Sequence, residues 1–157
     1  MTDIAMKDAC ELLDADHIAV KHLFVDYARQ AMAAPAEPGS RRALAERICQ
    51  ELTVHAQIEE EIFYPALRRV LGEPQLVDEA EAEHQQAKAL IARIQEMRGQ
   101  DPALDDVVSE LARAIEHHVK EERDVLFTKA RAAPGLDLQA IGAQLKTRQD
   151  ELMGQPA

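Results

Sequence analysis

The sequence contains no tryptophan, and only 3% of its 157 residues are aromatic, so the core must be largely aliphatic. Cys10 and Cys49 are too few for a disulfide framework, and we expect two small buried thiols in a reducing cytoplasm. No apolar run approaches the roughly 20 residues that a membrane-spanning helix needs. The first residues lack a basic stretch followed by an apolar one, so we expect no signal peptide.

Basic residues are also scarce, since 18 lysines and arginines face 29 aspartates and glutamates. The resulting net charge of −11 argues against nucleic acid or an anionic membrane as a partner, because both repel such a surface. Glycine and proline fall mostly between periodic stretches rich in good helix formers. These features predict an all-helical protein, and the length favours one domain.

The spacing of apolar residues predicts four long helices and one short helix, at about residues 3–33, 41–71, 76–98, 103–132 and 137–153. Short turns between the long helices favour an up-down-up-down antiparallel four-helix bundle over residues 1–135. We expect residues 136–157 to form an amphipathic helix and tail, packed on the outside of the same domain or mediating association. Ser40 is predicted to cap the second helix, and Pro65 to kink or thin it.

Two stretches repeat the same pattern of histidine followed four residues later by glutamate, at His55–Glu59 and at His118–Glu122. On a helix, residues i and i+4 lie on one face, so imidazole and carboxylate project in the same direction. A single pair is weak evidence for a metal site. Two copies 63 positions apart, with similar flanks, are much harder to attribute to chance.

Four histidines occupy positions on the apolar faces of the long predicted helices, one on each: His17, His55, His84 and His118. Each falls within about three residues of its helix midpoint, or under ~5 Å along the axis. The halves of the chain also repeat, because Asp16-His17 matches Glu83-His84. We therefore expect the four imidazoles to meet at one level of the core.

Four imidazoles and two carboxylates in one core layer need a cation, because bare buried carboxylates are costly to desolvate and repel each other. Histidine with bridging carboxylate suits iron, and manganese or zinc less specifically. Two carboxylates that bridge would serve two metals, each with two imidazoles and open positions. A single closed zinc site does not need six ligands.

The combination of these motifs resembles the hemerythrin-like (HHE cation-binding) domain family, in its bacterial branch. The resemblance covers about residues 10–131 and rests on Asp16-His17, His55-x-x-x-Glu59-Glu60 with Phe63-Tyr64-Pro65, Glu83-His84, and His118-x-x-x-Glu122 with Leu126-Phe127. It implies a non-haem di-iron centre, oxo- or hydroxo-bridged, that binds or reacts with dioxygen or related small molecules. The ligands that it implies are His17, His55, Glu59, His84, His118 and Glu122.

Two departures from the oxygen-carrying members of that family bear on function. Lys88 stands where they have a second histidine, and His118-x-x-x-Glu122 replaces their His-x-x-x-x-Asp. Losing a nitrogen ligand opens the site. We therefore favour sensing, storage or protection linked to iron or oxygen over transport.

Two further histidines compete for a place in the site. His117 keeps a five-residue spacing to Glu122, but it shares a face with Glu110 and Glu121 that looks solvated, so we favour His118. His22 lies about 140° around the helix from His17 and is interpreted as a flanking surface residue.

Among the other residues near the motifs, Glu60 is a candidate partner for a ligand, on an otherwise solvated acidic face. Tyr27 and Tyr64 are interpreted as core and rim residues. Tyr27 is the better redox candidate of the two, because it shares an apolar stripe with His17.

Three functions remain open from the sequence. The first is a binding or sensing protein for dioxygen, nitric oxide or iron, which we favour over an enzyme. The second is a di-iron peroxidase or oxidase that exploits the position opened at Lys88. The third is a metal-stabilised interaction module that uses the C-terminal helix, with a homodimer as one candidate assembly.

Overall fold

The computed structural model describes residues 7–33, 39–97 and 101–154, and within these ranges the secondary structure is entirely helical. The all-helical prediction is therefore confirmed. The elements in chain order are α1 (Ala9–Met32), α2 (Ser40–Ile58), η1 (Glu59–Phe63), α3 (Tyr64–Leu71), α4 (Pro74–Glu96), α5 (Leu104–Glu121), η2 (Glu122–Leu126), α6 (Phe127–Ala132) and α7 (Leu138–Leu152).

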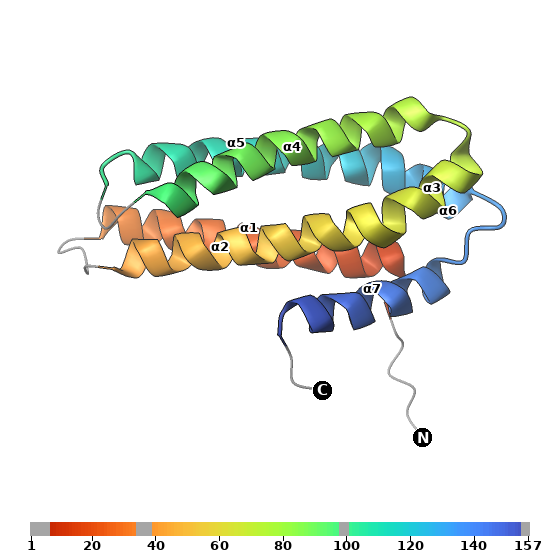
Figure 1. Ribbon diagram of the computed structural model, residues 1–157, viewed down its shortest axis with the longest axis horizontal. Coiled ribbons are helices and arrows are strands. Elements are labelled where there is room, and N and C mark those ends of the chain that lie inside the picture. The colour runs from red at the N-terminus through yellow and green to blue at the C-terminus, as the bar shows by residue number, and fades with distance from the viewer. Residues whose placement is uncertain (1–6, 34–38, 98–100, 155–157) are drawn as a thin grey trace, which may run out of the picture.

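The long helices lie in two layers (Figure 1), with α1 beside α2 in one and α4 beside α5 in the other. The continuous stretches α2–η1–α3 and α5–η2–α6 each form one rod, and α7 packs against α1, α2 and η1. No helix among the described residues is long and apolar enough to cross a membrane.

The apolar core is divided into two clusters along the helices. On α1, one cluster reaches from Ala9 to Leu13, and the other begins at Val20. His17 falls between them, so the histidine level separates two hydrocarbon layers. Cys10 and Cys49 are buried and free, as expected, and burial raises the pKa of their thiols to about 12 and about 11.

One predicted helix start and one predicted helix cap are wrong. The first helix begins at Ala9, because Asp8 and Glu11 form a capping box in which each side chain accepts the other's backbone N–H, at 2.8 and 3.0 Å. The predicted residues 3–6 lie outside the described part of the chain. Ser40 is the first residue of α2 and not its cap, since Gly39 occupies the cap with φ of 85°, a conformation that favours glycine.

Both rods contain a π-helical turn that begins at the glutamate of the repeated motif. In η1 the Tyr64 N–H donates to the Glu59 carbonyl, and in η2 the Phe127 N–H donates to the Glu122 carbonyl. Pro65 directly follows η1, where the wider π turn passes back into the α-helix of α3. Since η2 forms with Thr128 in the corresponding place, proline is not the cause, and the predicted distortion belongs to the motif itself.

Candidate metal centre

Four imidazoles converge on two carboxylates that are completely buried. Glu59 and Glu122 are 0% exposed, and the four histidines are 5–7% exposed. The shortest distances from each Nε2 to a carboxylate oxygen are 2.9 Å for His17 to Glu122, 3.3 Å for His55 to Glu59, 3.0 Å for His84 to Glu59 and 3.6 Å for His118 to Glu122. The structure thus brings together all six side chains that the sequence singled out.

The local structure explains why these atoms meet. Within each rod, histidine and glutamate are four residues apart and lie on one helical face. The π turn then begins at the glutamate itself, and π turns inside α-helices occur frequently at functional sites. The spacing of apolar residues did not predict these turns.

An outer set of carboxylates contacts the Nδ1 atom of each of the four central histidines. The Nδ1 to carboxylate distances are 3.2 Å for His17 to Asp14, 3.0 Å for His55 to Asp16, 2.7 Å for His84 to Glu60 and 2.7 Å for His118 to Glu83. A carboxylate that accepts from Nδ1–H fixes the orientation of the ring and leaves the lone pair of Nε2 available to a metal, as in many metal sites. Glu60 was expected in this role, whereas Asp14, Asp16 and Glu83 were not.

The repeat is broken in this outer set. Asp16 and Glu83 occupy matching positions and contact His55 and His118 in the same way. Glu60, in contrast, corresponds to Arg123 in the second rod. Arg123 pairs with Asp14, which in turn contacts the remaining histidine.

Buried charges in the centre act on one another. Burial opposes ionisation of Glu59, but the charge of His55 and hydrogen bonds to its neighbours hold the pKa of this carboxyl well below its usual range. Burial and the charge of Glu59 raise the pKa of Glu122. Burial opposes the charge on His118, yet hydrogen bonds to Glu59 and Glu83 raise its pKa to about 10. Without a cation, protons must compensate the buried negative charge.

The donor atoms fit a pair of cations. Two groups of ligand atoms, each lying within 4.8 Å of one another, share Glu59: one is Glu59, His84 and His118, and the other is His17, His55, Glu59 and Glu122. The buried atoms that have no well-aligned hydrogen bond include His17 Nε2, His55 Nε2, Glu59 Oε2 and Glu122 Oε1. His17 Nε2 and Glu122 Oε1 lie 2.9 Å apart, but their alignment does not make a hydrogen bond. Unpaired buried polar atoms are costly, and cations at the centre would satisfy them.

Tyr64 was predicted at the rim, but it is completely buried and lies in the centre. Its hydroxyl donates to Glu122 Oε2 at 2.9 Å and lies 3.2 Å from both Glu59 Oε1 and His84 Nε2. Burial and the two glutamates raise the pKa of this phenol well above its ordinary value. The preferred redox candidate, Tyr27, instead donates to Asp105 at 2.6 Å. The sequence did contain a signal for the special role of Tyr64. The matching position in the second rod holds Phe127, so the two repeats differ there by a hydroxyl.

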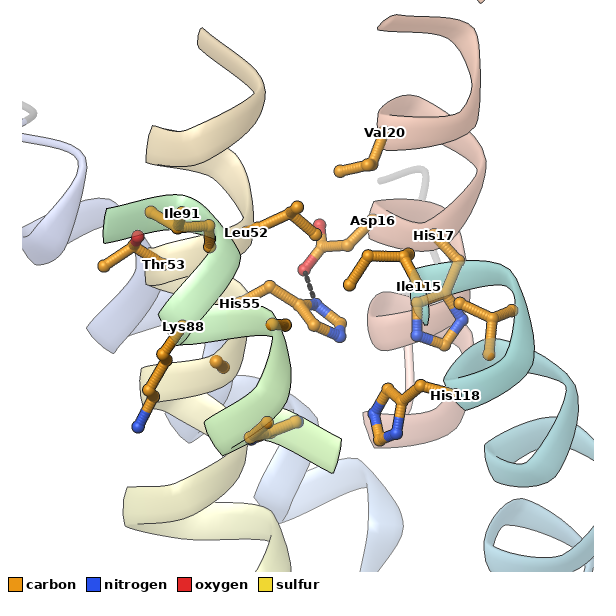
Figure 2. Close-up of a pocket in the computed structure, with 14 residues that line it drawn as sticks. Asp16, His17, Val20, Leu52, Thr53, His55, Lys88, Ile91, Ile115 and His118 are labelled. Atoms are coloured by element: carbon orange, nitrogen blue, oxygen red, sulfur yellow. Dashed lines mark hydrogen bonds and ion pairs between the residues drawn. The ribbon is translucent and has the colours of Figure 1, made fainter. Parts of the chain in front are cut away.

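A small cavity adjoins the histidines, with a volume of about 30 Å³ (Figure 2). Its apolar walls come from all four long helices and include Val20, Leu52, Ile91 and Ile115. The amine of Lys88 points away from the imidazoles in Figure 2 and lies 2.8 Å from Glu60 Oε1. The position that holds a histidine in oxygen carriers therefore leaves this cavity without an extra donor.

The two rival histidines lie outside the buried cluster. His22 is exposed on α1. The His117 side chain is 65% exposed, and its Nε2 lies 3.3 Å from both Glu83 and Glu121.

The sequence matches the family described as Hemerythrin HHE cation binding domain over residues 8–130, and the chain belongs to that family. A crystal structure of an HHE domain-containing protein from Mycobacterium kansasii, a homologue of Rv2633c, is 25% identical and superposes with a TM-score of 0.75. That superposition covers 95% of this chain and 89% of the other. The fold and the buried His/Glu cluster therefore belong to a cation-binding domain.

Two curated relatives are also similar to this chain. Rv2633c of Mycobacterium tuberculosis is 26% identical over 151 residues, which are 95% of this chain and 89% of that protein. A DNA nickase from Nostoc is 29% identical over 121 residues, or 77% of this chain. The chain spans only 33% of the nickase.

Proposed function

We propose that this chain is a non-haem di-iron protein that binds or senses dioxygen, nitric oxide or iron. The proposed ligands are His17, His55, Glu59, His84, His118 and Glu122. The observation that carries the proposal is the convergence of four Nε2 atoms on two fully buried carboxylates, with donor atoms left unpaired. We further propose that residues 1–135 form an up-down-up-down four-helix bundle around this centre, and that residues 136–157 belong to the same domain.

Iron is favoured over zinc and manganese by the mixture of donors. Imidazole with carboxylate suits iron, whereas structural zinc is closed by four ligands and leaves no use for six. Two donor groups that share Glu59 support two ions rather than one.

The protein residues supply position and enclosure. The outer carboxylates hold each imidazole by Nδ1, so that its Nε2 points at the centre. The apolar walls of the 30 Å³ cavity disfavour water and charged species, which selects small uncharged ligands beside the histidines. Bound iron would supply reversible coordination of a diatomic ligand or a change of redox state.

Metal analysis and an absorption spectrum test this proposal. The iron-loaded protein should hold about two irons per chain and show near-ultraviolet charge-transfer bands that change on exposure to dioxygen or nitric oxide. Glu59→Gln and Glu122→Gln should lose most of the iron. Glu61→Gln is the matched control, because the side chain of Glu61 lies on the same π turn but pairs with Arg148 at the surface. One tightly held zinc and no capacity for iron would refute the proposal.

A second candidate function is a peroxidase- or oxidase-type reaction, favoured by Tyr64. Its phenol lies among the proposed ligands and is a potential source of one electron and one proton. Many turnovers of peroxide by the iron-loaded protein would support this function. Consumption of a single equivalent would count against it.

We propose no DNA-directed activity from the similarity to the nickase, because a net charge of −11 disfavours DNA as a partner. A homodimer and a cytoplasmic location stay predictions.

A further inference from the structure

The internal repeat creates two equivalent grooves, one along each helical hairpin. The groove between α1 and α2–η1 is covered by α7. The matching groove, between α4 and α5–η2, contains an open cavity of about 110 Å³. We call it the acidic groove, because Glu79, Glu83 and Glu121 line it above His118 and Glu122.

Two exchanges between the repeats explain the difference. Glu79 corresponds to Leu12, 67 positions earlier, and Glu121 corresponds to Ile58, 63 positions earlier. Leu12 is 7% exposed and Ile58 is 0% exposed, and both belong to the core cluster that contains Ile141 and Leu145 of α7. An apolar helix laid over the acidic groove would bury carboxylates without partners, which is costly. The exchanged residues therefore keep this groove hydrated and negative.

The acidic groove leads directly to the proposed ligands. At its mouth, His117 Nε2 lies 3.3 Å from Glu83 Oε2 and 3.3 Å from Glu121 Oε1, and the three side chains place ligand atoms within 4.8 Å of one another. The other oxygen of Glu83 lies 2.7 Å from His118 Nδ1. Deeper in the groove is Glu122, which lines it and is completely buried. Its Oε1 lies 2.9 Å from His17 Nε2 without making an aligned hydrogen bond, so it stays available to a cation.

We propose that the acidic groove is the route by which a divalent cation reaches the buried centre, with Glu83, His117 and Glu121 holding the ion transiently at the mouth. This inference rests on the proposed function, since it requires a centre that takes up cations. Carboxylates along a groove raise the local cation concentration and replace part of the ion's water shell. The cavity beside the histidines is unsuited to this traffic, because its apolar walls offer a hydrated ion no compensation. Cations and small uncharged ligands thus reach the centre by separate routes.

The rate of cobalt(II) uptake by the metal-free full-length chain tests the route. Stopped-flow absorption follows the cobalt ligand-field bands as the centre fills. Glu79→Gln combined with Glu121→Gln should slow uptake roughly tenfold at low ionic strength and leave the final stoichiometry unchanged. The matched control combines Asp106→Asn with Glu110→Gln, because both side chains are exposed on α5 away from the groove and the net charge changes equally. The control should load at the wild-type rate.

A second variant separates the route from a general charge effect. Val125 lines the acidic groove, and Val125→Phe narrows it without changing charge. This variant should also load several-fold more slowly at an unchanged final stoichiometry. Uptake at the wild-type rate by either groove variant would overturn the inference while leaving the centre in place. A wild-type chain that takes up no cobalt would instead refute the proposed function itself.

Discussion

The Tyr64 hydroxyl lies 2.9 Å from Glu122 Oε2, so a phenol from one rod is hydrogen-bonded to a proposed ligand of the other. The corresponding residue in the second rod, Phe127, stacks on His17 with ring centroids 5.9 Å apart. The hydroxyl of Tyr64 therefore has no counterpart in the second half of the centre.

Tyr64→Phe should preserve the fold and the stoichiometry of two irons but change the spectrum of the loaded protein. The phenol oxygen lies 3.2 Å from His84 Nε2, within reach of an ion held there. The raised pKa keeps the proton on this phenol in the metal-free chain, but an ion bound beside it would displace the proton and add Tyr64 to the six proposed ligands. We therefore expect a visible phenolate-to-iron band in the wild type that is absent from the variant, and a fall in iron affinity of roughly tenfold.

Tyr27→Phe is the matched control for that experiment. It removes a hydroxyl bonded to Asp105 and should cost about 1–2 kcal/mol of stability without altering the spectrum. Identical spectra for the wild type and Tyr64→Phe would show that the phenol does not coordinate the metal.

The metal-free protein should lose stability as the pH rises from about 6.5 to about 10. The folded-state pKa of His118 is raised to about 10 from an ordinary value of 6.5, so its contribution is complete below pH 6.5 and is lost as the pH passes through 10. Glu59 acts at the acidic end of the pH range. Its depressed pKa adds stability that is lost as the pH falls below 4.5, the ordinary pKa of a glutamate. Urea unfolding at pH 6, 8 and 10 would measure the alkaline loss.

Metal loading should release protons at pH 7, because an ion displaces the proton from His118 and makes this imidazole a neutral ligand. A pH-indicator dye in weakly buffered solution would record the release. The loaded protein should also show little of the alkaline loss of stability. Loading without proton release would mean that His118 is already neutral in the metal-free chain.

Gly142→Ala should loosen α7. An added Cβ at Gly142 would lie 2.5 Å from the Lys7 carbonyl oxygen and 2.9 Å from the Ala9 backbone nitrogen, and neither backbone atom is free to move aside cheaply. We expect a loss of about 1–3 kcal/mol, measured by thermal unfolding, with faster hydrogen exchange in α7.

The control for that prediction is Gln144→Ala, on the exposed side of α7. It adds helix propensity without approaching α1, so stability should stay equal or rise slightly. An equal or more stable Gly142→Ala variant would show that α7 shifts without cost.

Gln149→Ala should weaken metal binding from outside the centre. The side-chain amide of Gln149, on α7, lies 2.9 Å from Asp16 Oδ2, and that oxygen lies 3.0 Å from His55 Nδ1. Releasing Asp16 should lower metal affinity several-fold, less than the 10- to 100-fold typical of a residue bonded directly to a ligand. A competing chelator would measure the change.

Arg148→Ala is the control on the neighbouring residue, because Arg148 pairs with Glu61 at the surface and should leave metal affinity unchanged. If both variants bind metal as the wild type does, α7 has no influence on the ligands.

Much of the fold and the centre was predictable because helices impose a fixed period on their side chains. The four inward histidines and the two His-x-x-x-Glu pairs stand at positions where a period of 3.6 residues places them on apolar faces. That regularity accounts for the helical class and for the six converging side chains.

The remaining features depend on contacts between helices, about which a single helix's period carries no information. Asp16 holds a histidine of α2 and Glu83 holds one of α5, so neither could be paired with its partner along the sequence. The π turns shift the residues after each glutamate by one position, which brings Tyr64 from an expected rim position to the centre. The placement of α7 over only one of two equivalent grooves was likewise decided by packing across helices.

The sequence by itself determined which side chains face inward, because periodicity is a local property of the chain. Only the tertiary structure decided which of them touch, since distances between helices follow from how their surfaces pack.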